Sequence, residues 1–323
     1  MPFQIWKIEI NYENLLLSLT STEVKFLLKS QNGVMQMKEH RKSILLLAAT
    51  AVLWSLGGVL IKWVQLNALA IAGLRSLIAF AFIMIAFRPR LRISPIKITG
   101  GFVYAAVVIL FVSANKLTTA ANAILLQYTA PVYVALLGYW FLKEKITRTD
   151  WIAISMVLCG MVLFFLDKLS AGDMLGNIVA ILSGVAFAWL VLLMRKQKNE
   201  SPLDSVILGN LITAIICLPF YFQSSIDARS WTGLLLLGVV QLGLSYVLYA
   251  YAIRHVSAIE AILIPVIEPI LNPIWVLIFL GETPGFWAII GGIIVIGSLT
   301  YRSTVQIWGK KAVGFEPEAN GLE

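Results

Sequence analysis

The chain has 323 residues, of which 59% are hydrophobic and only 13% charged, and its mean hydropathy is +0.86. A soluble domain carries about 25% charged residues, so this composition excludes an ordinary soluble fold. The net charge of +8 lies in short segments between apolar blocks, which indicates membrane topology rather than a nucleic-acid surface. Cys159 and Cys217 sit inside apolar blocks and are too few for a disulfide framework.

Residues 1–41 are unlike the rest, because they carry many charges and no run long enough to cross a bilayer. The stretch Leu15–Leu17 is too short for a signal-peptide core. Two interpretations stay open. Residues 1–41 are an N-terminal tail, or the start is mis-called and Met35 or Met37 is the true initiator, directly before a basic flank.

Ten apolar blocks follow, each about long enough to cross a hydrocarbon core of roughly 30 Å as a helix. Inside lipid every backbone polar group must be paired internally, and the blocks lack the alternation of strands, so they predict helices. The predicted fold class is therefore all-α integral membrane. The spans lie at about 43–63, 67–87, 98–115, 118–142, 150–166, 174–194, 203–223, 231–253, 257–281 and 285–304.

The distribution of Lys and Arg predicts the orientation of the helices. If the N-terminus is cytoplasmic, seventeen of these residues flank helix ends on the cytoplasmic side. The opposite side then holds only Lys62, Lys116, Lys168 and Arg229. This bias predicts an even number of spans and both termini in the cytoplasm, in a cell (inner or plasma) membrane.

The chain also matches itself at an offset of 138 residues. Ala123-Ile-Leu125 corresponds to Ala261-Ile-Leu263, Pro131 to Pro269, and Glu144 to Glu282. We expect a first repeat at 43–167, a second at 174–304 and a C-terminal tail at 305–323. Each repeat holds five helices, and an odd number inverts the second repeat relative to the first. Inverted repeats are common in transporters, where they enclose one central site.

These residues resemble a known family. The segments Ala123-Ile-Leu-Leu-Gln-Tyr-Thr-Ala-Pro131 with Glu144, and Ala261-Ile-Leu-Ile-Pro-Val-Ile-Glu-Pro269 with Gly281-Glu282, look like the paired EamA domains of the drug/metabolite transporter superfamily. The resemblance covers about 43–304. It implies ten helices, cytoplasmic ends, a central cavity, and transport, typically export, of amino acids, metabolites or drugs.

Two charged residues lie within predicted spans. Arg75 is in the second span, where a charge costs about 2.5–3.5 kcal/mol on insertion scales. It either holds helices together, which the resemblance favours, or attracts an anionic substrate group. Glu268 precedes Pro269 in the ninth span. It binds a cation, takes part in proton coupling, pairs with Arg75, or stays neutral and serves packing.

Prolines interrupt the fourth and ninth spans. Pro265, Pro269 and Pro273 recur every four residues, and Pro131 is the counterpart in the first repeat. Each proline lacks a backbone N–H and leaves a carbonyl one turn earlier without its helical donor. These carbonyls either line a polar cavity, or the prolines only bend the helices. Glu144 and Glu282 lie at helix ends, where we expect them to order turns.

Other polar and aromatic residues within the spans are candidates for a substrate cavity, although each is also typical of packing between helices. They are Gln127, Tyr128, Trp54, Ser55, Trp189, Gln241, Tyr246 and Asn272.

We predict a secondary transporter that moves a small molecule by alternating access, most simply as an exporter. No catalytic, nucleotide-binding or metal motif is present, so we expect neither an enzyme nor a cofactor. The expected partners are the lipid bilayer and a small-molecule substrate, and not nucleic acid. A proton or other coupling ion and a homodimer stay open. The alternatives are a membrane-embedded lipid-modifying enzyme and a structural or sensory membrane protein.

Overall fold

The computed structural model describes residues 21–166, 174–222, 226–271 and 285–313, and in these residues the regular structure is helical with no strand. Contacts divide the chain into two units, residues 1–42 and 43–323. The described part of the first unit is the beginning of helix α2 (Ser21–Trp54). Helix therefore begins well before residue 43, inside the segment that we expected to precede the first span.

Three helices of the first half begin at residues whose side chains cap the helix N-terminus. The side chains of Asn67, Thr119 and Thr147 cap the N-termini of α4, α6 and α8, because each accepts a bond from a free backbone N–H in the first turn. The helices after α2 are α3 (Gly57–Trp63), α4 (Ala68–Phe87), α5 (Pro95–Leu117), α6 (Ala120–Gln127), α7 (Ala130–Leu142) and α8 (Arg148–Phe165).

The second half repeats one of these signals. Ser257 caps α13 in a capping box with Glu260, at the position that corresponds to Thr119 before α6. The described elements of the second half are α9 (Met174–Lys196), α10 (Leu203–Ile216), the short 3₁₀ helix η2 (Leu218–Phe220), α11 (Ala228–Leu235), the π-helical η3 (Leu236–Leu244), α12 (Ser245–Ala252), α13 (Ala258–Leu263), the 3₁₀ helix η4 (Ile264–Val266) and α15 (Phe286–Val313).

Seven helical segments in the described residues are long and apolar enough to cross a membrane. They are Met35–Trp63, Ala68–Phe87, Pro95–Leu117, Asn122–Leu142, Met174–Lys196, Ala228–Ala252 and Phe286–Val305. The remaining predicted spans fall on α8, on the shorter apolar helix α10, and on 257–281, of which 272–281 lies outside the described residues. The chain is therefore a multi-pass helical membrane protein, whereas ten crossings remain a prediction.

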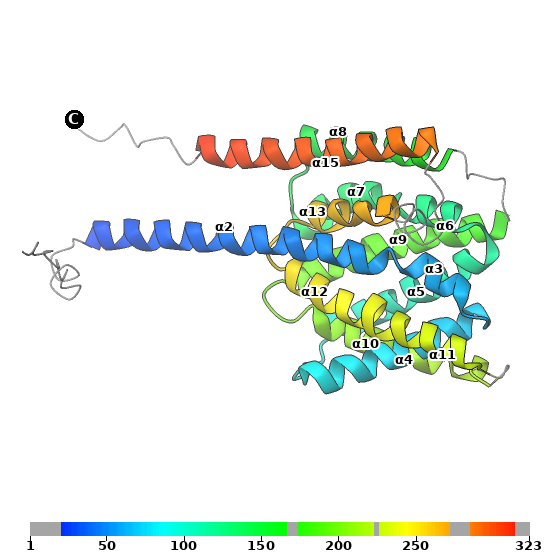
Figure 1. The fold of residues 1–323 in the computed structure, drawn as a ribbon. Helices are drawn as coiled ribbons and strands as arrows, with labels where there is room; N and C mark the ends of the chain where they lie inside the picture. Colours follow the sequence, from blue (N-terminus) through cyan, green and yellow to red (C-terminus); the bar gives the residue numbers. More distant parts are fainter. Residues whose placement is uncertain (1–20, 167–173, 223–225, 272–284, 314–323) are drawn as a thin grey trace, which may run out of the picture. The chain divides into compact units, whose positions relative to one another are not determined.

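Contacts within residues 43–323 pair equivalent helices of the two halves. The last helices of the halves, α8 and α15, pack together and run alongside each other in Figure 1. The second helices, α4 and α10, also contact each other. The contact of α4 with η3 has a counterpart in the contact of α10 with α5. Helices of each half thus pack against the equivalent or neighbouring helices of the other half, as we expect for two related repeats.

Buried charges and small residues hold the α8–α15 pair. Arg302 on α15 donates from Nε to Asp150 at the start of α8 over 2.8 Å, and both side chains are almost fully buried. Its guanidinium also lies 3.9 Å from Glu260 on α13. Gly291 allows the close approach, since a side chain there would strike the carbonyl of Gly160. These contacts tie α15 to both halves.

Candidate functional site: a central polar cavity

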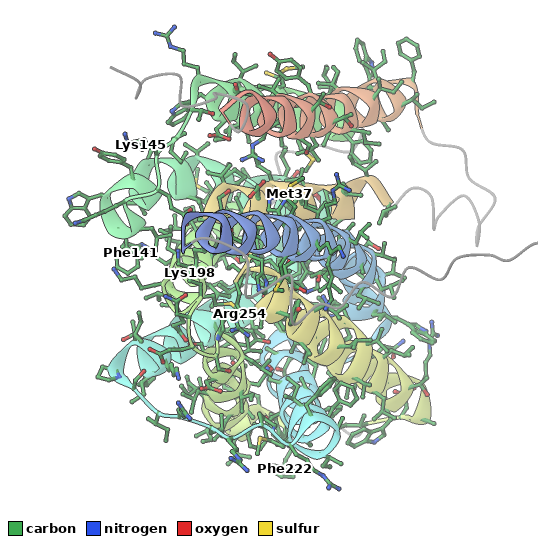
Figure 2. The ribbon with its side chains drawn as sticks, turned by 90° about the vertical axis from the view of Figure 1, so that its left-hand side faces the viewer. Met37, Phe141, Lys145, Lys198, Phe222 and Arg254 are labelled. Atoms are coloured by element: carbon green, nitrogen blue, oxygen red, sulfur yellow. The ribbon has the colours of Figure 1, made fainter. Side chains whose placement is uncertain are left out.

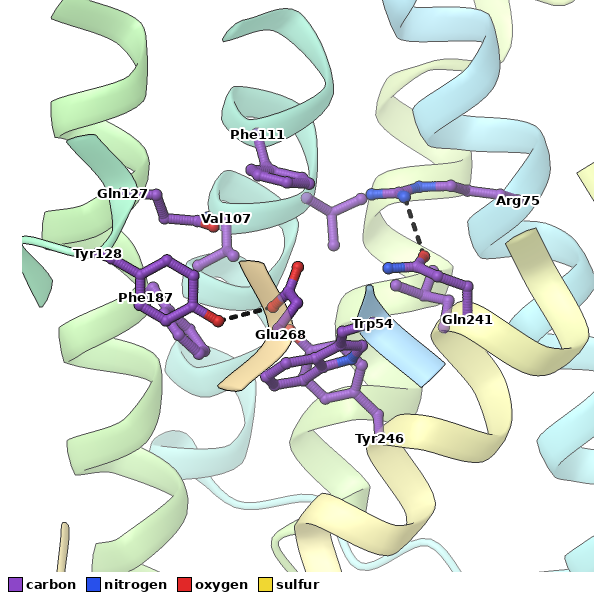
Figure 3. Close-up of a pocket in the computed structure, with 12 residues that line it drawn as sticks. Trp54, Arg75, Val107, Phe111, Gln127, Tyr128, Phe187, Gln241, Tyr246 and Glu268 are labelled. Atoms are coloured by element: carbon purple, nitrogen blue, oxygen red, sulfur yellow. Dashed lines mark hydrogen bonds between the residues drawn. The ribbon is translucent and has the colours of Figure 1, made fainter. Parts of the chain in front are cut away.

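A cavity of about 440 Å³, its opening included, lies between the two halves (Figure 3). Helices α2, α4, α5 and α6 contribute from the first half, and α9, η3, α12 and the helical residues 267–271 from the second. The lining residues are Trp54, Arg75, Val107, Val108, Phe111, Gln127, Tyr128, Phe187, Gln241, Leu242, Tyr246 and Glu268.

Four irregular segments of helix adjoin this cavity. The first span breaks at Ser55 and Leu56, between α2 and α3, and the fourth breaks after Gln127, between α6 and α7. Gln241 lies within the π-helical η3, and η4 immediately precedes the helical turn that carries Glu268. Turns, π-bulges and short 3₁₀ stretches inside helices frequently lie at functional sites. The breaks therefore mark the cavity as the polar centre of the bundle.

Glu268 and Tyr128 form the closest polar contact across the two halves in this cavity. The phenolic oxygen of Tyr128 lies 2.7 Å from Oε2 of Glu268 and 2.9 Å from the carbonyl oxygen of Pro265 (Figure 3). A phenol has one hydrogen to donate. Both contacts are satisfied together when Tyr128 donates to Pro265 and a protonated Glu268 donates to Tyr128. This geometry suits a neutral carboxylic acid at residue 268.

The carbonyls freed by proline are paired by tyrosines. Pro265 and Pro269 have no N–H, so the carbonyls of Ala261 and Pro265 lose their usual helical donors. Tyr249 donates its hydroxyl to the carbonyl of Ala261 over 3.1 Å, and Tyr128 lies within hydrogen-bonding distance of that of Pro265. The carbonyl of Pro265 therefore contacts Tyr128, one member of the Tyr128–Glu268 pair in the cavity.

Arg75 occupies another wall of the cavity, on α4. Its Nη1 donates to Oε1 of Gln241 over 3.2 Å, and its side chain is only 2% exposed (Figure 3). Nε is buried and makes no hydrogen bond in the described structure. The residue that we grouped with structural positions therefore faces the cavity as a cation held by one amide.

An aromatic cluster separates these polar groups. Trp54 donates its indole N–H to Oγ of Ser245 over 2.9 Å, and that hydroxyl donates in turn to the carbonyl of Gln241. The ring of Trp54 packs against Tyr246 at 5.1 Å and against Phe187 at 5.8 Å between centroids. The end of α2 is thereby fixed to the π-helical segment that carries Gln241.

A second polar cluster ties the two halves together at one end of the bundle, where Phe141, Lys145, Lys198 and Arg254 lie (Figure 2). Glu144 accepts from Nε of Arg195 over 2.7 Å and from the backbone N–H of Ala258, the first residue of α13, over 2.9 Å. Arg195 also donates to the carbonyls of Ile253 and Arg254. We call Glu144, Arg195 and Ala258 the end cluster.

The structure brings six of the predicted cavity residues together and adds Arg75. Ser55 is not among the lining residues, since its hydroxyl donates to the carbonyl of Val52 at the helix break. Trp189 lies elsewhere on α9, with its ring 5.6 Å from that of Phe141. Asn272, Pro273 and Glu282 lie outside the described residues. Those brought together are Trp54, Gln127, Tyr128, Gln241, Tyr246 and Glu268.

Sequence reasoning missed the apolar lining residues. In a membrane protein the lipid-facing and cavity-facing sides of a helix can both be apolar, so the composition of a span does not separate them. Val107, Val108 and Phe111 follow a one-sided helical spacing on α5, but the rest of that helix is equally apolar. Phe187 and Leu242 had no distinguishing signal for the same reason.

A multi-pass helical bundle built from two repeats around a small polar cavity is an architecture typical of membrane proteins that carry small molecules. The chain belongs to the EamA-like transporter family, whose family model matches residues 41–166 and 174–303. The family resemblance drawn from the sequence is therefore confirmed, and the chain has a general role in membrane transport.

Several known proteins similar to this chain are also transporters. YdfC of Bacillus subtilis, an uncharacterized transporter, is 27% identical over 71% of this chain and 78% of its own length. An uncharacterized transporter of Archaeoglobus fulgidus is 26% identical over 76% of this chain and 77% of its own. The pseudopaline exporter CntI of Pseudomonas aeruginosa is 24% identical over 62% of this chain and 72% of its own. A crystal structure of another protein, 15% identical, matches with a TM-score of 0.71 over 82% of this chain and 98% of that one, which supports the fold.

Proposed function

We propose that this chain is a secondary transporter that exports a small solute in exchange for protons, with the central cavity as its alternating site. The observation that carries the proposal is the Tyr128–Glu268 pair. Its two short contacts favour a protonated carboxyl, and the other carboxyl oxygen makes no hydrogen bond within the described structure. Buried carboxyls that gain and lose a proton serve as proton relays in pumps and transporters.

The exchange of protons for solute follows if a proton and the solute compete for the carboxyl of Glu268. In the arrangement described, Glu268 is neutral and paired with Tyr128. A cationic group of a solute that enters the cavity favours the ionised carboxylate, so binding releases the proton to that side. After the cavity opens to the other side, a proton that binds Glu268 displaces the solute. The transporter then returns with a neutral Glu268.

The end cluster is the proposed gate on one side. Glu144 belongs to the first half, and Arg195 and Ala258 to the second, so opening this end separates charge-assisted hydrogen bonds. The Lys and Arg bias supports a cytoplasmic location for this end and for both termini. The closed end cluster then corresponds to a state closed to the cytoplasm.

The export direction is supported by one relative, which is named an exporter. Reconstitution with a mixture of metabolites tests transport even though the solute is not identified. Proteoliposomes loaded with a cell metabolite extract are placed in a bath that is more acidic than their lumen, and released solutes are measured by mass spectrometry. We expect at least one solute to leave faster than from vesicles with Glu268→Gln protein. Equal release from both preparations, and from protein-free vesicles, would contradict the proposal.

A further inference from the structure

A group of exposed cations lies outside the central cavity, at the ends of α7 and α9 and in the turn before α13. We call this group the basic rim, and its members are Lys143, Lys145, Lys196, Lys198 and Arg254. Among the described residues, none of the five has a carboxylate within 4.0 Å, whereas the neighbouring Arg195 is paired with Glu144. The charge of the basic rim is therefore left for a partner outside the chain.

Printed contacts bring the members of the basic rim together. Nζ of Lys196 lies 3.4 Å from the carbonyl oxygen of Phe141 and 5.2 Å from the centre of its ring, and Phe141 is two residues before Lys143. Nε of Arg254 donates to the carbonyl of Lys198 over 3.0 Å. An ammonium has three donors, of which Phe141 takes one. Because Lys143 belongs to the first half and Lys196 to the second, an anion held by both would join the two halves.

Lys143 has a backbone conformation that glycine adopts at lower cost. It caps the C-terminus of α7 with φ 58° and ψ 23°, in the left-handed region where a side chain crowds the backbone. Gly281 stands at the corresponding position of the second half in the sequence. Glycine is the usual residue that ends a helix in this way. A strained lysine at such a position points to a function for its side chain.

The face of α7 that leads to Lys143 suits the interface between lipid and water. Leu136, Tyr139 and Trp140 follow the helical spacing of three and four residues, and all three are exposed, Trp140 by 79%. Tyr and Trp are enriched at the depth of the lipid headgroups in membrane proteins. Lys143 and Lys145 come directly after this face, so their ammonium groups can reach the layer of lipid phosphates.

We propose that the basic rim binds the headgroup of an anionic phospholipid, with the phosphate between Lys143 and Lys196 and the acyl chains along the exposed face of α7. Membrane topology alone explains an excess of cations at this end. It explains neither the strained cap at Lys143 nor the position of Lys196 over Phe141. Anionic headgroups attract cations that lie just outside a span. The bound lipid joins the two halves beside the end cluster, whichever solute the cavity carries.

Trp140 provides a local probe of the bound lipid. The protein is reconstituted in mixtures of phosphatidylcholine and phosphatidylglycerol, one of which carries bromine on its acyl chains and quenches nearby tryptophan fluorescence. The part of the signal that Trp140→Phe removes reports this face of α7. We expect phosphatidylglycerol to associate there about fivefold or more strongly than phosphatidylcholine, since each cation near the headgroup contributes about that factor.

Lys143→Gly separates lipid binding from folding. In phosphatidylcholine it is expected to keep or raise the unfolding temperature, because glycine relieves the left-handed backbone. The preference of the variant for phosphatidylglycerol is expected to fall about fivefold. Lys145→Gln lowers the preference in the same direction and leaves the helix cap intact. Arg88→Gly is the matched control, because Arg88 caps α4 with φ 45° but lies outside the basic rim, so the preference is kept.

The proposal is overturned if both lipids quench Trp140 equally in the wild type, or if Lys143→Gly keeps the wild-type preference. Inorganic phosphate in the bath would overturn it by removing the preference at an ionic strength where sodium chloride does not, since the basic rim would then bind a soluble anion. A lower unfolding temperature of Lys143→Gly in phosphatidylcholine would assign Lys143 to the helix end instead. Proton-driven release in the vesicle assay tests the proposed function separately from all of these results.

Discussion

The hydroxyl of Tyr128 lies 2.7 Å from the carboxyl of Glu268 and joins the two halves of the bundle at the centre of the cavity. Tyr128 ends α6 in the first half, and Glu268 follows η4 in the second. Both side chains lie next to proline-induced irregularities, so the backbone features that break these helices also bring the pair together.

Replacement of Glu268 by Gln is expected to abolish proton-driven flux and leave folding nearly unchanged. Glutamine keeps the size and a hydrogen-bonding end but cannot exchange a proton. Flux in proteoliposomes and unfolding temperature in detergent measure the two effects. Glu200→Gln is the control, since Glu200 is 59% exposed and lies outside the cavity. A Glu268→Gln protein with wild-type flux and pH dependence would contradict the role of this carboxyl.

Replacement of Tyr128 by Phe is expected to lower stability by about 1–3 kcal/mol, because the carbonyl of Pro265 loses the phenolic donor and Glu268 loses its hydrogen-bond partner. Tyr249→Phe should lower stability by a similar amount, since Tyr249 serves the equivalent carbonyl of Ala261. Only Tyr128→Phe should change the pH profile of flux, as only Tyr128 contacts Glu268. Identical pH profiles for both variants and the wild type would rule out a part for Tyr128 in proton exchange.

Replacement of Glu144 by Gln is expected to loosen the end cluster. The variant loses a charge-assisted bond to Arg195 and weakens the cap of α13, together about 1.5–3 kcal/mol of preference for the closed end. Hydrogen–deuterium exchange should rise at residues 258–263. Lys196→Gln is the control, since Lys196 contacts Phe141 and not the cluster. Equal protection in Glu144→Gln and in wild type would show that the cluster does not hold this end.

Replacement of Gly238 by Ala is expected to displace α4 from η3. The added Cβ would lie 2.5 Å from Cβ of Ile78 and 2.9 Å from the carbonyl oxygen of Arg75. Overpacking of this kind lowers stability by about 1–3 kcal/mol, and here it also shifts the helix that positions Arg75. Gly58→Ala is the control, because in the described residues nothing beyond its chain neighbours and its own helix backbone lies within 4 Å of the added Cβ. Equal unfolding temperatures for Gly238→Ala and Gly58→Ala would contradict the close packing of Gly238 against α4.

The sequence predicted the class, the repeats and most polar cavity residues, because charges, amides and prolines are conspicuous in apolar spans. Glu268 and Tyr128 were identifiable in this way. The role of Arg75 was harder to predict, since the sequence does not show whether a buried arginine faces a partner or a cavity. The break at Ser55 and the π-helical segment that holds Gln241 contain no proline. Glycines adjoin both, but a glycine in an apolar span indicates close helix packing as readily as a break.

Access to the cavity from both membrane faces tests the central claim most directly. Val108 lines the cavity and has nearly the size of cysteine, so Val108→Cys places a thiol there with little change in packing. The native thiols are removed by Cys159→Ala and Cys217→Ala, and the protein with these two changes alone is the control for background labelling. An impermeant maleimide reaches one membrane face in intact cells and the other in inverted vesicles. The account predicts labelling of Val108→Cys from both faces, with the ratio altered by Glu268→Gln. Labelling from one face only, in every condition, would contradict alternating access.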